Sequence, residues 1–257
     1  MTSRPTPTAS PRPLASLKIP VDAPVEARLL RRYKRFLADV ELPDGRALTV
    51  HCPNPGSMLG TQAPGSTVRC SVHDDPRRKL RHTLEMIRVG RVWVGLHAAR
   101  ANDVAHAVLD ANAYAPLAGY FRLEREVASP EGSRFDFRLS SPTAGRAAAG
   151  PAGVCWVEVK SVTLCSAGRA RFPDAVTERG RRHLEHLAER VAAGERAALV
   201  FVVQRADAIS VAPADDIDPA YGRALRAAAA AGVELHALSA RVGPRAIRLA
   251  GPLPVLL

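Results

Sequence analysis

The sequence predicts an α/β (α+β) protein with two domains, a small β-barrel followed by a mixed α/β sheet. Three observations support this prediction. The chain has 257 residues, a length that fits two small domains or one large domain with a real core. Up to about residue 97 it consists of short predicted strands and tight turns, with no convincing helix. From about residue 100 onward, helices alternate with strands, which is typical of a sheet covered by helices.

The barrel is predicted from five short strands. Residues 35–42 alternate apolar and mostly polar side chains with the period of a half-buried strand. Pro43-Asp44-Gly45 is a hairpin turn signal, and residues 47–52 form the returning strand. The later strands are expected at 68–72, 84–89 and 92–97. Five strands suit an OB-like barrel, although their periodicity alone does not distinguish it from an SH3-like barrel.

The second part of the chain mixes helices and strands. In chain order we expect a helix at 102–113, strands at 121–127, 133–139 and 153–164, a helix at 174–193, a strand at 196–204, a helix that opens at Asp218-Pro219 and a last strand at 233–238. Asp218 is a capping acceptor followed by proline at the first helical position, and Gly194 and Gly232 end their helices. The Ala/Gly-rich segment 140–153 is expected to be a flexible loop.

These elements place a domain junction between residues 80 and 100. We assign residues 1–16 to a disordered tail because they contain four prolines and no apolar helix-forming core. Residues 17–83 are assigned to the OB-like nucleic-acid-binding domain and 84–257 to the α/β domain. A signal peptide would need a continuous apolar stretch, and no window approaches the ~18 apolar residues of a membrane span. We therefore expect a cytoplasmic protein that has no membrane partner.

The net charge points to an anionic partner. Lys and Arg number 36 against 25 Asp and Glu, for a formal charge of +11. Residues 1–82 hold 14 basic and 7 acidic residues, whereas 83–257 hold 22 and 18, so the first third carries +7 and the rest +4. Such a local excess favours nucleic acid, whose counterions are released when basic residues bind. An arginine-rich composition without such a partner is the alternative.

Two predicted strands carry charged residues that suggest a reaction. Asp136 is flanked by two phenylalanines, which we expect on the opposite face of its strand. In Cys155-Trp-Val-Glu-Val-Lys160, Glu158 and Lys160 share one face and stand about 6.6–6.8 Å apart along the strand. Adjacent strands would then present two carboxylates and an ammonium to one point.

This arrangement suits a divalent cation. Carboxylate pairs with few other ligands are typical of Mg²⁺ (or Mn²⁺), which prefers hard oxygens and keeps several waters. We expect Asp136 and Glu158 to bind the metal, with the Val159 carbonyl as a further ligand, and Lys160 to orient or activate a water. An Asp followed after about twenty residues by Glu-x-Lys on the next strand is the pattern of PD-(D/E)xK nucleases. The alternative is an exposed, salt-bridged strand face.

Glu124 and Glu126 lie on the preceding predicted strand, on one face. Either could join the metal cluster, and Glu126 is the candidate that we retain among the catalytic residues. The alternative for both is a solvated strand face.

Basic residues near these elements would hold a polynucleotide. Arg31-Arg-Tyr-Lys-Arg-Phe36 interleaves charge with aromatic rings, a composition that suits phosphate contact and base stacking. On the predicted helix 174–193, basic side chains group along one flank beside the expected metal site. The candidate nucleic-acid-binding residues are Arg31, Arg32, Lys34, Arg35, Asn54, Arg77, Arg78, Lys79, Arg179 and His183. The alternatives are solubilising arginines, a core Phe36 and an Asn54 that caps its own loop.

Eight stretches of the sequence resemble one known family. They are RRYKRFLADVELPDG, HCPNPGSM, RRKLRHTLE, GSRFDFRL, CWVEVKSVTL, FPDAVTERG, FVVQR and PLPVLL. Together they are similar to the sugar fermentation stimulation protein A family of bacteria and archaea over about residues 25–257. The resemblance implies an N-terminal OB-fold domain, a C-terminal PD-(D/E)xK nuclease-like domain and DNA binding. By matching position it puts Asp136, Glu158 and Lys160 on the nuclease-like motif, with Glu126 from the segment before it.

These inferences converge on a DNA-binding protein with a Mg²⁺- or Mn²⁺-dependent phosphodiesterase (nuclease) site in its C-terminal domain. The DNA could be single- or double-stranded. The alternatives are a DNA-binding regulator without turnover and an RNA-binding or RNA-processing protein. The oligomeric state, including a homodimer, stays open.

Overall fold

The computed structural model describes residues 12–130, 132–141 and 153–257. Most of the predicted tail and of the predicted loop at 140–153 therefore lies outside the described residues. The end of the tail is an exception, because Leu14–Ser16 forms a 3-10 helix and Leu14 packs against the core of the larger domain. Among the described helices, none is both long and apolar enough to cross a membrane.

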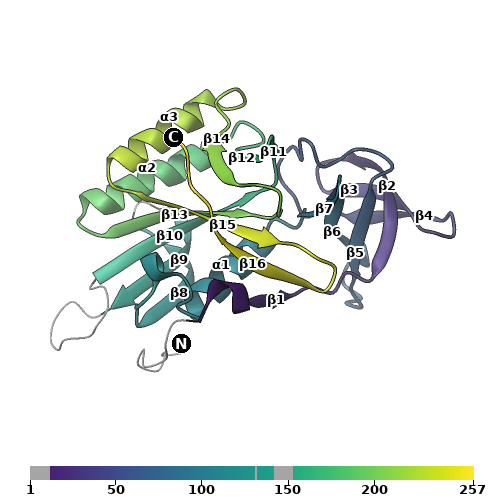
Figure 1. Cartoon of the computed structure of the whole chain (residues 1–257), viewed down its shortest axis with the longest axis horizontal. Helices are drawn as coiled ribbons and strands as arrows, with labels where there is room; N and C mark the ends of the chain where they lie inside the picture. The colour runs from purple at the N-terminus through teal and green to yellow at the C-terminus, as the bar shows by residue number, and fades with distance from the viewer. Residues whose placement is uncertain (1–11, 131, 142–152) are drawn as a thin grey trace.

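The first domain is a closed barrel, as predicted (Figure 1). Its strands are β2 (Val25–Tyr33), β3 (Leu37–Glu41), β4 (Ala47–His51), β5 (Thr67–Val72), β6 (His82–Val89) and β7 (Val92–Gly95). The sheet order is β4-β3-β2-β5-β6-β7, and a parallel pairing of His51 with Thr83 joins β4 to β6. The five strands β2 to β6 thus close on themselves, in an OB-like arrangement, and β7 is added to β6. The five differ from the prediction in one member, because β2 was not expected and the strand expected at 92–97 is the added β7.

The barrel departs from its predicted bounds at both ends. The expected boundary after residue 83 falls inside β6, whose Met86 pairs with Gly95 of β7, so the barrel sheet continues to Gly95. At the other end, β1 (Lys18–Pro20) pairs antiparallel with β16 through Ile19 and Ile247. Residues 18–20 therefore belong to the sheet of the second domain, because their backbone hydrogen-bonding partners lie there.

The second domain is built on a seven-stranded mixed sheet with the order β1-β16-β15-β13-β10-β9-β8. Its remaining strands are β8 (Arg122–Ala128), β9 (Arg134–Ser141), β10 (Gly153–Val162), β13 (Arg196–Val203), β15 (Glu234–Arg241) and β16 (Ala246–Pro252). A small sheet contains β11 (Cys165–Ser166), β12 (Arg169–Phe172) and β14 (Ser210–Pro213). The small sheet and β16 were not predicted, so the strand expected at 233–238 is not the last.

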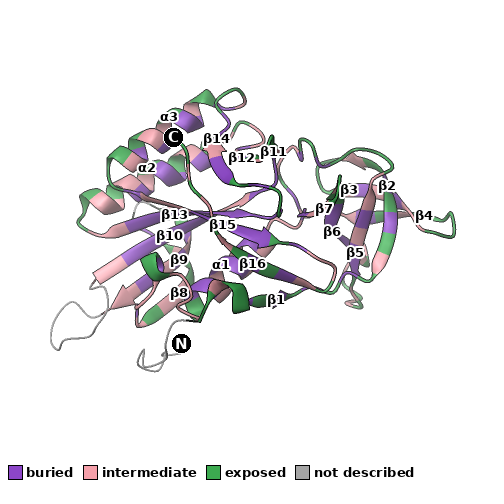
Figure 2. Cartoon of the chain, in the orientation of Figure 1, coloured by how far each residue is buried: buried purple, intermediate pink, exposed green. Residues whose placement is uncertain are grey.

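Helices cover both faces of the large sheet (Figures 1 and 2). They are α1 (Arg100–Asp110), α2 (Glu178–Ala192) and α3 (Pro219–Ala230), with a short 3-10 helix at Ala115–Leu117. One core lies between α1 and the sheet, a second lies between the sheet and the α2–α3 pair, and a third fills the barrel. The helix expected from residue 174 begins at Glu178, because the Thr177 side chain accepts a hydrogen bond from Gly180 N (3.0 Å) as its N-cap.

Candidate active site

A cavity of about 640 Å³ lies where the barrel meets the large sheet. Its wall is formed by the barrel loop after β4, the start of α1, the middle of β10, the segment between β12 and α2, and the first turns of α2. The predicted site residues on this wall are Arg35, Asn54, Asp136, Glu158, Val159, Lys160, Arg179 and His183. The structure thus brings the predicted acidic pair and its lysine together with basic residues of both domains.

Asp136 lies where β9 separates from β10. The ladder between these antiparallel strands ends at the pair Phe137–Val157. At the next position the Asp136 carboxylate replaces the missing backbone partner, and its Oδ2 accepts a hydrogen bond from Val159 N (2.7 Å). Its Oδ1 accepts a second hydrogen bond from Asn102 Nδ2 on α1 (2.6 Å). The separation of β9 from β10 therefore makes room for the Asp136 side chain, and the hydrogen bonds from Val159 N and Asn102 Nδ2 hold its carboxylate in place.

This separation corrects the expected placement of the two phenylalanines beside Asp136. Phe137 packs into the core beneath α1, whereas Phe135 packs against Trp156 and His183 in the core beneath α2. They do not share one core because β9 leaves the ladder between them.

Glu158 is buried, with only 4% of its surface exposed. Its Oε1 accepts a hydrogen bond from Lys160 Nζ (2.6 Å) and also lies against His183 Nδ1. Its Oε2 is buried and has no hydrogen-bonding partner among the described residues. An ionised carboxylate accepts at both oxygens, so one half of this group lacks a ligand.

The two carboxylates titrate in opposite directions. Burial, with the nearby charge of Glu158, raises the pKa of Asp136 to about 6, despite the hydrogen bonds from Val159 and Asn102. Burial alone would also raise the pKa of Glu158, but the charge of Lys160 and the hydrogen bond from His183 hold that pKa below its ordinary value. The site thus pairs a firmly ionised carboxylate with one that ionises near neutral pH.

The residues present fit a small divalent cation. Glu158 Oε2 is an orphaned oxygen, and the Val159 carbonyl lies on the same strand edge as the Val159 N–H that meets Asp136. No group of three or more His, Cys, Asp or Glu side chains with metal-ligand geometry occurs in the described parts of the chain. A cation here would take its other ligands from backbone oxygen, water and substrate, which suits Mg²⁺.

The structure does not place Glu126 on the cavity wall. Its side chain is exposed, and its backbone has a left-handed φ of 52°. Glu126 has no ladder pairing, although the register of β8 with β9 does not shift around it: Arg125 pairs with Phe137 and Val127 with Phe135, so Glu126 stands opposite Asp136. Its neighbour Glu124 is ion-paired with Arg138 (3.1 Å).

The barrel residues on the cavity wall belong to a tightly held loop. Arg32 donates from its guanidinium to the carbonyl oxygens of Asn54 (2.9 Å), Gly56 (2.8 Å) and Ser57 (3.2 Å). Asn54 Oδ1 accepts from Gly56 N (2.9 Å), so this side chain caps its own loop. Arg35 Nε donates to the Pro55 carbonyl (3.0 Å), with its side chain exposed on the cavity wall. Arg32 therefore has a structural role, whereas Arg35 is available to a ligand.

The other predicted basic residues of the barrel lie off the cavity wall. Arg31 pairs with Asp39 (2.8 Å), and Arg77 pairs with Asp75 (2.9 Å). Arg78 donates to Thr83 Oγ1 (2.7 Å). The remaining two are exposed, namely Lys34 in the β2–β3 turn and Lys79 before β6.

Two residues of this site were not predicted. Asn102 orients Asp136, and Asp174 joins the two domains beside the cavity. Asp174 accepts from Met58 N (2.8 Å), and its carbonyl accepts from Ser57 Oγ (2.5 Å). Both residues lie in stretches of ordinary polarity, and nothing in their local sequence indicates these contacts.

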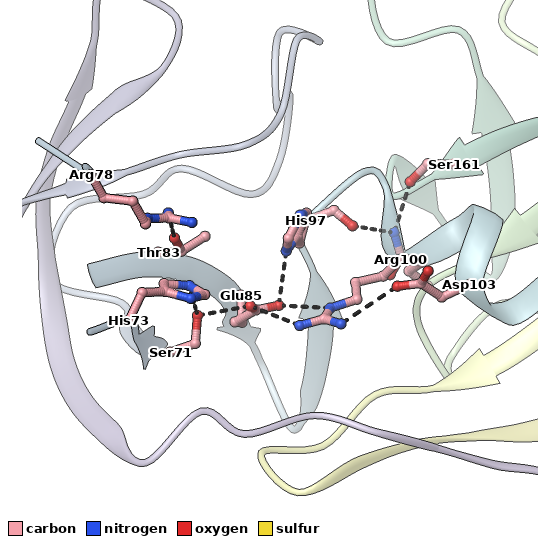
Figure 3. A network of polar contacts seen from close by, with 10 residues as sticks. Ser71, His73, Arg78, Thr83, Glu85, His97, Arg100, Asp103 and Ser161 are labelled. Carbon is pink, nitrogen blue, oxygen red and sulfur yellow. Dashed lines mark hydrogen bonds and ion pairs between the residues drawn. The ribbon is translucent and has the colours of Figure 1, made fainter. Parts of the chain in front are cut away.

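A buried polar network joins the barrel to α1 (Figure 3). Glu85 of β6 accepts hydrogen bonds from Arg100 at both oxygens (3.1 and 3.2 Å) and from Ser71 Oγ (2.9 Å), and His97 Nδ1 lies 3.2 Å from its Oε2. Because Arg100 begins α1 and Asn102 follows in the same turn, this network fixes the helix that orients Asp136.

Comparison with known proteins identifies the family. The chain matches two family models, the SfsA N-terminal OB domain over residues 30–96 and the sugar fermentation stimulation protein RE domain over residues 99–246. The second match alone spans more than half of the chain. The chain belongs to the sugar fermentation stimulation protein family. The two SfsA matches meet where β7 ends and α1 begins.

Curated SfsA relatives extend over nearly the whole chain. A sugar fermentation stimulation protein homolog of Geobacter sulfurreducens is 47% identical over 246 residues, which is 96% of this chain and 97% of the relative. A homolog of Halorhodospira halophila is 51% identical over 233 residues, covering 90% and 94%. The structure of Pyrococcus furiosus SfsA in complex with Ca²⁺ has a TM-score of 0.81 at 24% identity and covers 94% of this chain and 100% of that one. At this identity the structural match establishes the fold.

Proposed function

We propose that this SfsA family member is a DNA-binding, divalent-metal-dependent phosphodiesterase, that is, a nuclease. The observation that carries the proposal is Glu158 Oε2, a buried carboxylate oxygen with no partner among the described residues. Leaving a buried acceptor unpaired costs about 1–3 kcal/mol, and more for a charged group. A cation between Glu158 and Asp136 would remove that cost. The Pyrococcus furiosus protein was determined with Ca²⁺, which supports a divalent ion here.

The side chains around this point have separable roles. Asp136, Glu158 and the Val159 carbonyl would hold Mg²⁺ (or Mn²⁺). When bound, such an ion stabilises charge on phosphoryl oxygens and lowers the pKa of a bound water. Asn102 keeps the Asp136 carboxylate in position. Lys160 Nζ, 2.6 Å from Glu158 Oε1, would orient the attacking water and offset the negative charge that develops on the phosphate.

Basic residues at the cavity wall would position the polynucleotide. Arg35 comes from the barrel, and Arg179 comes from the first turn of α2, so they belong to different domains. Both are exposed and would contact phosphates. This arrangement would place a phosphodiester within reach of Glu158 and Asp136.

A DNA-binding regulator without turnover is the second candidate. Lys160 and His183 already occupy Glu158 Oε1, as in an internal salt bridge. The lack of a three-residue metal group among the described residues also favours this candidate. RNA in place of DNA is an alternative substrate for either function.

The test is cleavage of labelled DNA and RNA with Mg²⁺ or Mn²⁺. We expect Asp136→Ala and Lys160→Gln to lower the rate at least a hundredfold. The first removes a proposed metal ligand and the second removes the cation beside the phosphate, and electrostatic stabilisation of this kind contributes about that much. Arg46→Ala is the matched control, since Arg46 is an exposed barrel residue paired with Asp44 and lies off the cavity wall. Metal-dependent cleavage that survives both substitutions would contradict the assignment. Salt-sensitive binding without any cleavage would favour the regulator.

A further inference from the structure

We infer that the cavity accepts a single strand of nucleic acid and excludes the intact duplex. This inference rests on the proposed function, because it names the substrate class of the same site. Three features carry it, namely the burial of Glu158 and Lys160 within the cavity, a contact between the domains beside it, and an exposed aromatic ring next to its wall.

The acidic and lysine side chains that the proposed function uses lie deep in the cavity. The lining residues Glu158 and Lys160 are largely buried, with side-chain exposures of 5% and 12%. A phosphate must therefore enter the cavity to reach them, and a single strand is thin enough to bring it there.

A contact between the two domains closes one side of the cavity. Ser57 Oγ donates to the Asp174 carbonyl (2.5 Å), and Met58 N donates to the Asp174 carboxylate (2.8 Å). Gly56 allows this approach, because a Cβ there would lie 2.5 Å from Asp174 Oδ1. Gly56 and Asp174 both line the cavity, and we call their contact the 56–174 bridge.

A duplex would have to open the 56–174 bridge, and the hydrogen bonds on both sides of the bridge oppose this. Its barrel side is held by Arg32, which donates hydrogen bonds to three carbonyl oxygens of the loop after β4. Opening it would break these hydrogen bonds or those to Asp174. Hydrogen bonds to charged groups contribute about 1.5–3 kcal/mol each, so the closed form is the stable one.

An aromatic surface lies next to the cavity wall. Phe36 is 43% exposed, and the Arg35 guanidinium carbon lies 5.9 Å from its ring centroid. Arg35 lines the cavity, so a strand held by this arginine could stack a base on Phe36. Base stacking on an aromatic side chain requires an unpaired base, which a single strand offers and a duplex does not.

The first experiment compares binding of one labelled oligonucleotide of about 30 nucleotides as a single strand, as a blunt duplex and as a duplex with a single-stranded tail. Fluorescence anisotropy is measured with and without Ca²⁺ for the full chain, and cleavage is followed separately with Mg²⁺. We expect the single strand and the tailed duplex to bind at least tenfold more tightly than the blunt duplex, and cuts to fall in unpaired segments. Equal or tighter binding of the blunt duplex would overturn the inference.

Two variants test the features separately. Phe36→Leu keeps an apolar side chain but removes the ring, and we expect about a tenfold loss of single-strand affinity with little change for the duplex. Leu30→Ala is its control, because Leu30 is a barrel side chain exposed to a similar extent (41%). Asp174→Ala, with the milder Ser57→Ala, should raise duplex binding relative to single-strand binding. An equal fall for both substrates would mean that the bridge only supports the fold, and would contradict its gating role.

The outcomes separate this inference from the proposed function. Selective single-strand binding without cleavage would support the substrate class and overturn the nuclease. Metal-dependent cleavage of blunt duplex as fast as of single strand would support the nuclease and overturn the substrate class.

Discussion

Asp136 has an environment that disfavours its charge in the folded, metal-free chain. Burial and Glu158 together raise its pKa to about 6, above the ordinary 3.8. A carboxyl whose pKa is raised on folding stabilises the folded state when protonated, so its ionisation lowers stability as the pH rises from about 4 through about 6. A bound cation would reverse that penalty.

Replacement of this carboxylate should therefore stabilise the metal-free protein in a pH-dependent way. We compare the free energy of unfolding of Asp136→Asn with that of the wild type. The difference should change by about 3 kcal/mol in favour of the variant as the pH is raised from about 4 to about 8. Urea unfolding of metal-free protein over this pH range measures the shift. A difference that is constant with pH would contradict the raised pKa.

The clustering of Asp136, Glu158 and Lys160 could be predicted from the sequence, but the residues that support them could not. Glu158 and Lys160 are two apart on a regular apolar strand, so the period of two places them on one face. Asn102 and Asp174 act on partners 34 and 116 residues away. The first contact depends on how α1 packs on the sheet, and the second on how the two domains dock. Glu126 was expected to join the acidic cluster, but its side chain is exposed and does not line the cavity, and its left-handed backbone conformation has no signal in the local sequence.

At the scale of elements, the start of α1 depends on one buried acid of the barrel. The hydrogen bonds and charges of His97 and Arg100 outweigh burial and lower the pKa of Glu85 to about 2, from 4.5. A carboxyl with a depressed pKa contributes stability that is fully present above about pH 4.5 and is lost as the pH falls through about 2. The joint between barrel and helix should thus weaken in acid.

Glu85→Gln should remove this contribution. We expect it to lower the free energy of unfolding by about 3 kcal/mol at neutral pH and by progressively less below about pH 4. It should also slow cleavage while the barrel stays folded, because the network of Glu85 holds α1, and Asn102 of α1 orients Asp136. Denaturation at several pH values tests the first point. Parallel pH profiles for variant and wild type would count against it.

The N-termini of α2 and α3 are linked by one side chain. Asp218 accepts hydrogen bonds from Tyr221 N in its own helix (2.9 Å) and from Thr177 N before α2 (2.9 Å). Asp218→Ala should cost about 2–3 kcal/mol, more than the ~1 kcal/mol of an ordinary cap. Asp218→Ser keeps one acceptor and should recover about half of the loss, as measured by thermal unfolding. Equal losses would show that the second bond contributes nothing.

The strands that escaped prediction are those whose alternation of buried and exposed residues is interrupted or too short to recognise. In β2, buried Ala27 and Leu29 alternate with exposed residues, but the following arginine pair obscures the pattern. The two-residue β11 and the four-residue β12 and β14 are too short to show a period. By contrast, α3 was predicted from Asp218, Pro219 and Gly232 because caps are local signals.

At the scale of the whole molecule, the +11 charge is not uniformly available to a polynucleotide. Both Arg77 and Arg179 are exposed, but Arg77 is paired with Asp75 away from the cavity wall, whereas Arg179 lies on that wall. Each phosphate contact adds about 0.7 to the salt dependence of single-strand binding. Arg179→Ala should lower that slope by about this amount, and Arg77→Ala should leave it unchanged. Titrations at several salt concentrations distinguish these results, and equal slopes for both variants would contradict the cavity as the binding site.

The central claim is that Asp136 and Glu158 bind a divalent cation. Isothermal titration of the full chain with Mn²⁺ tests it most directly, with Glu158→Gln as the variant and Glu124→Gln as the control. Glu124 is a carboxylate of the same domain that pairs with arginines away from the cavity wall. We predict one Mn²⁺ per chain, bound at least tenfold more weakly by Glu158→Gln and equally well by Glu124→Gln. Unchanged affinity in Glu158→Gln would contradict the account.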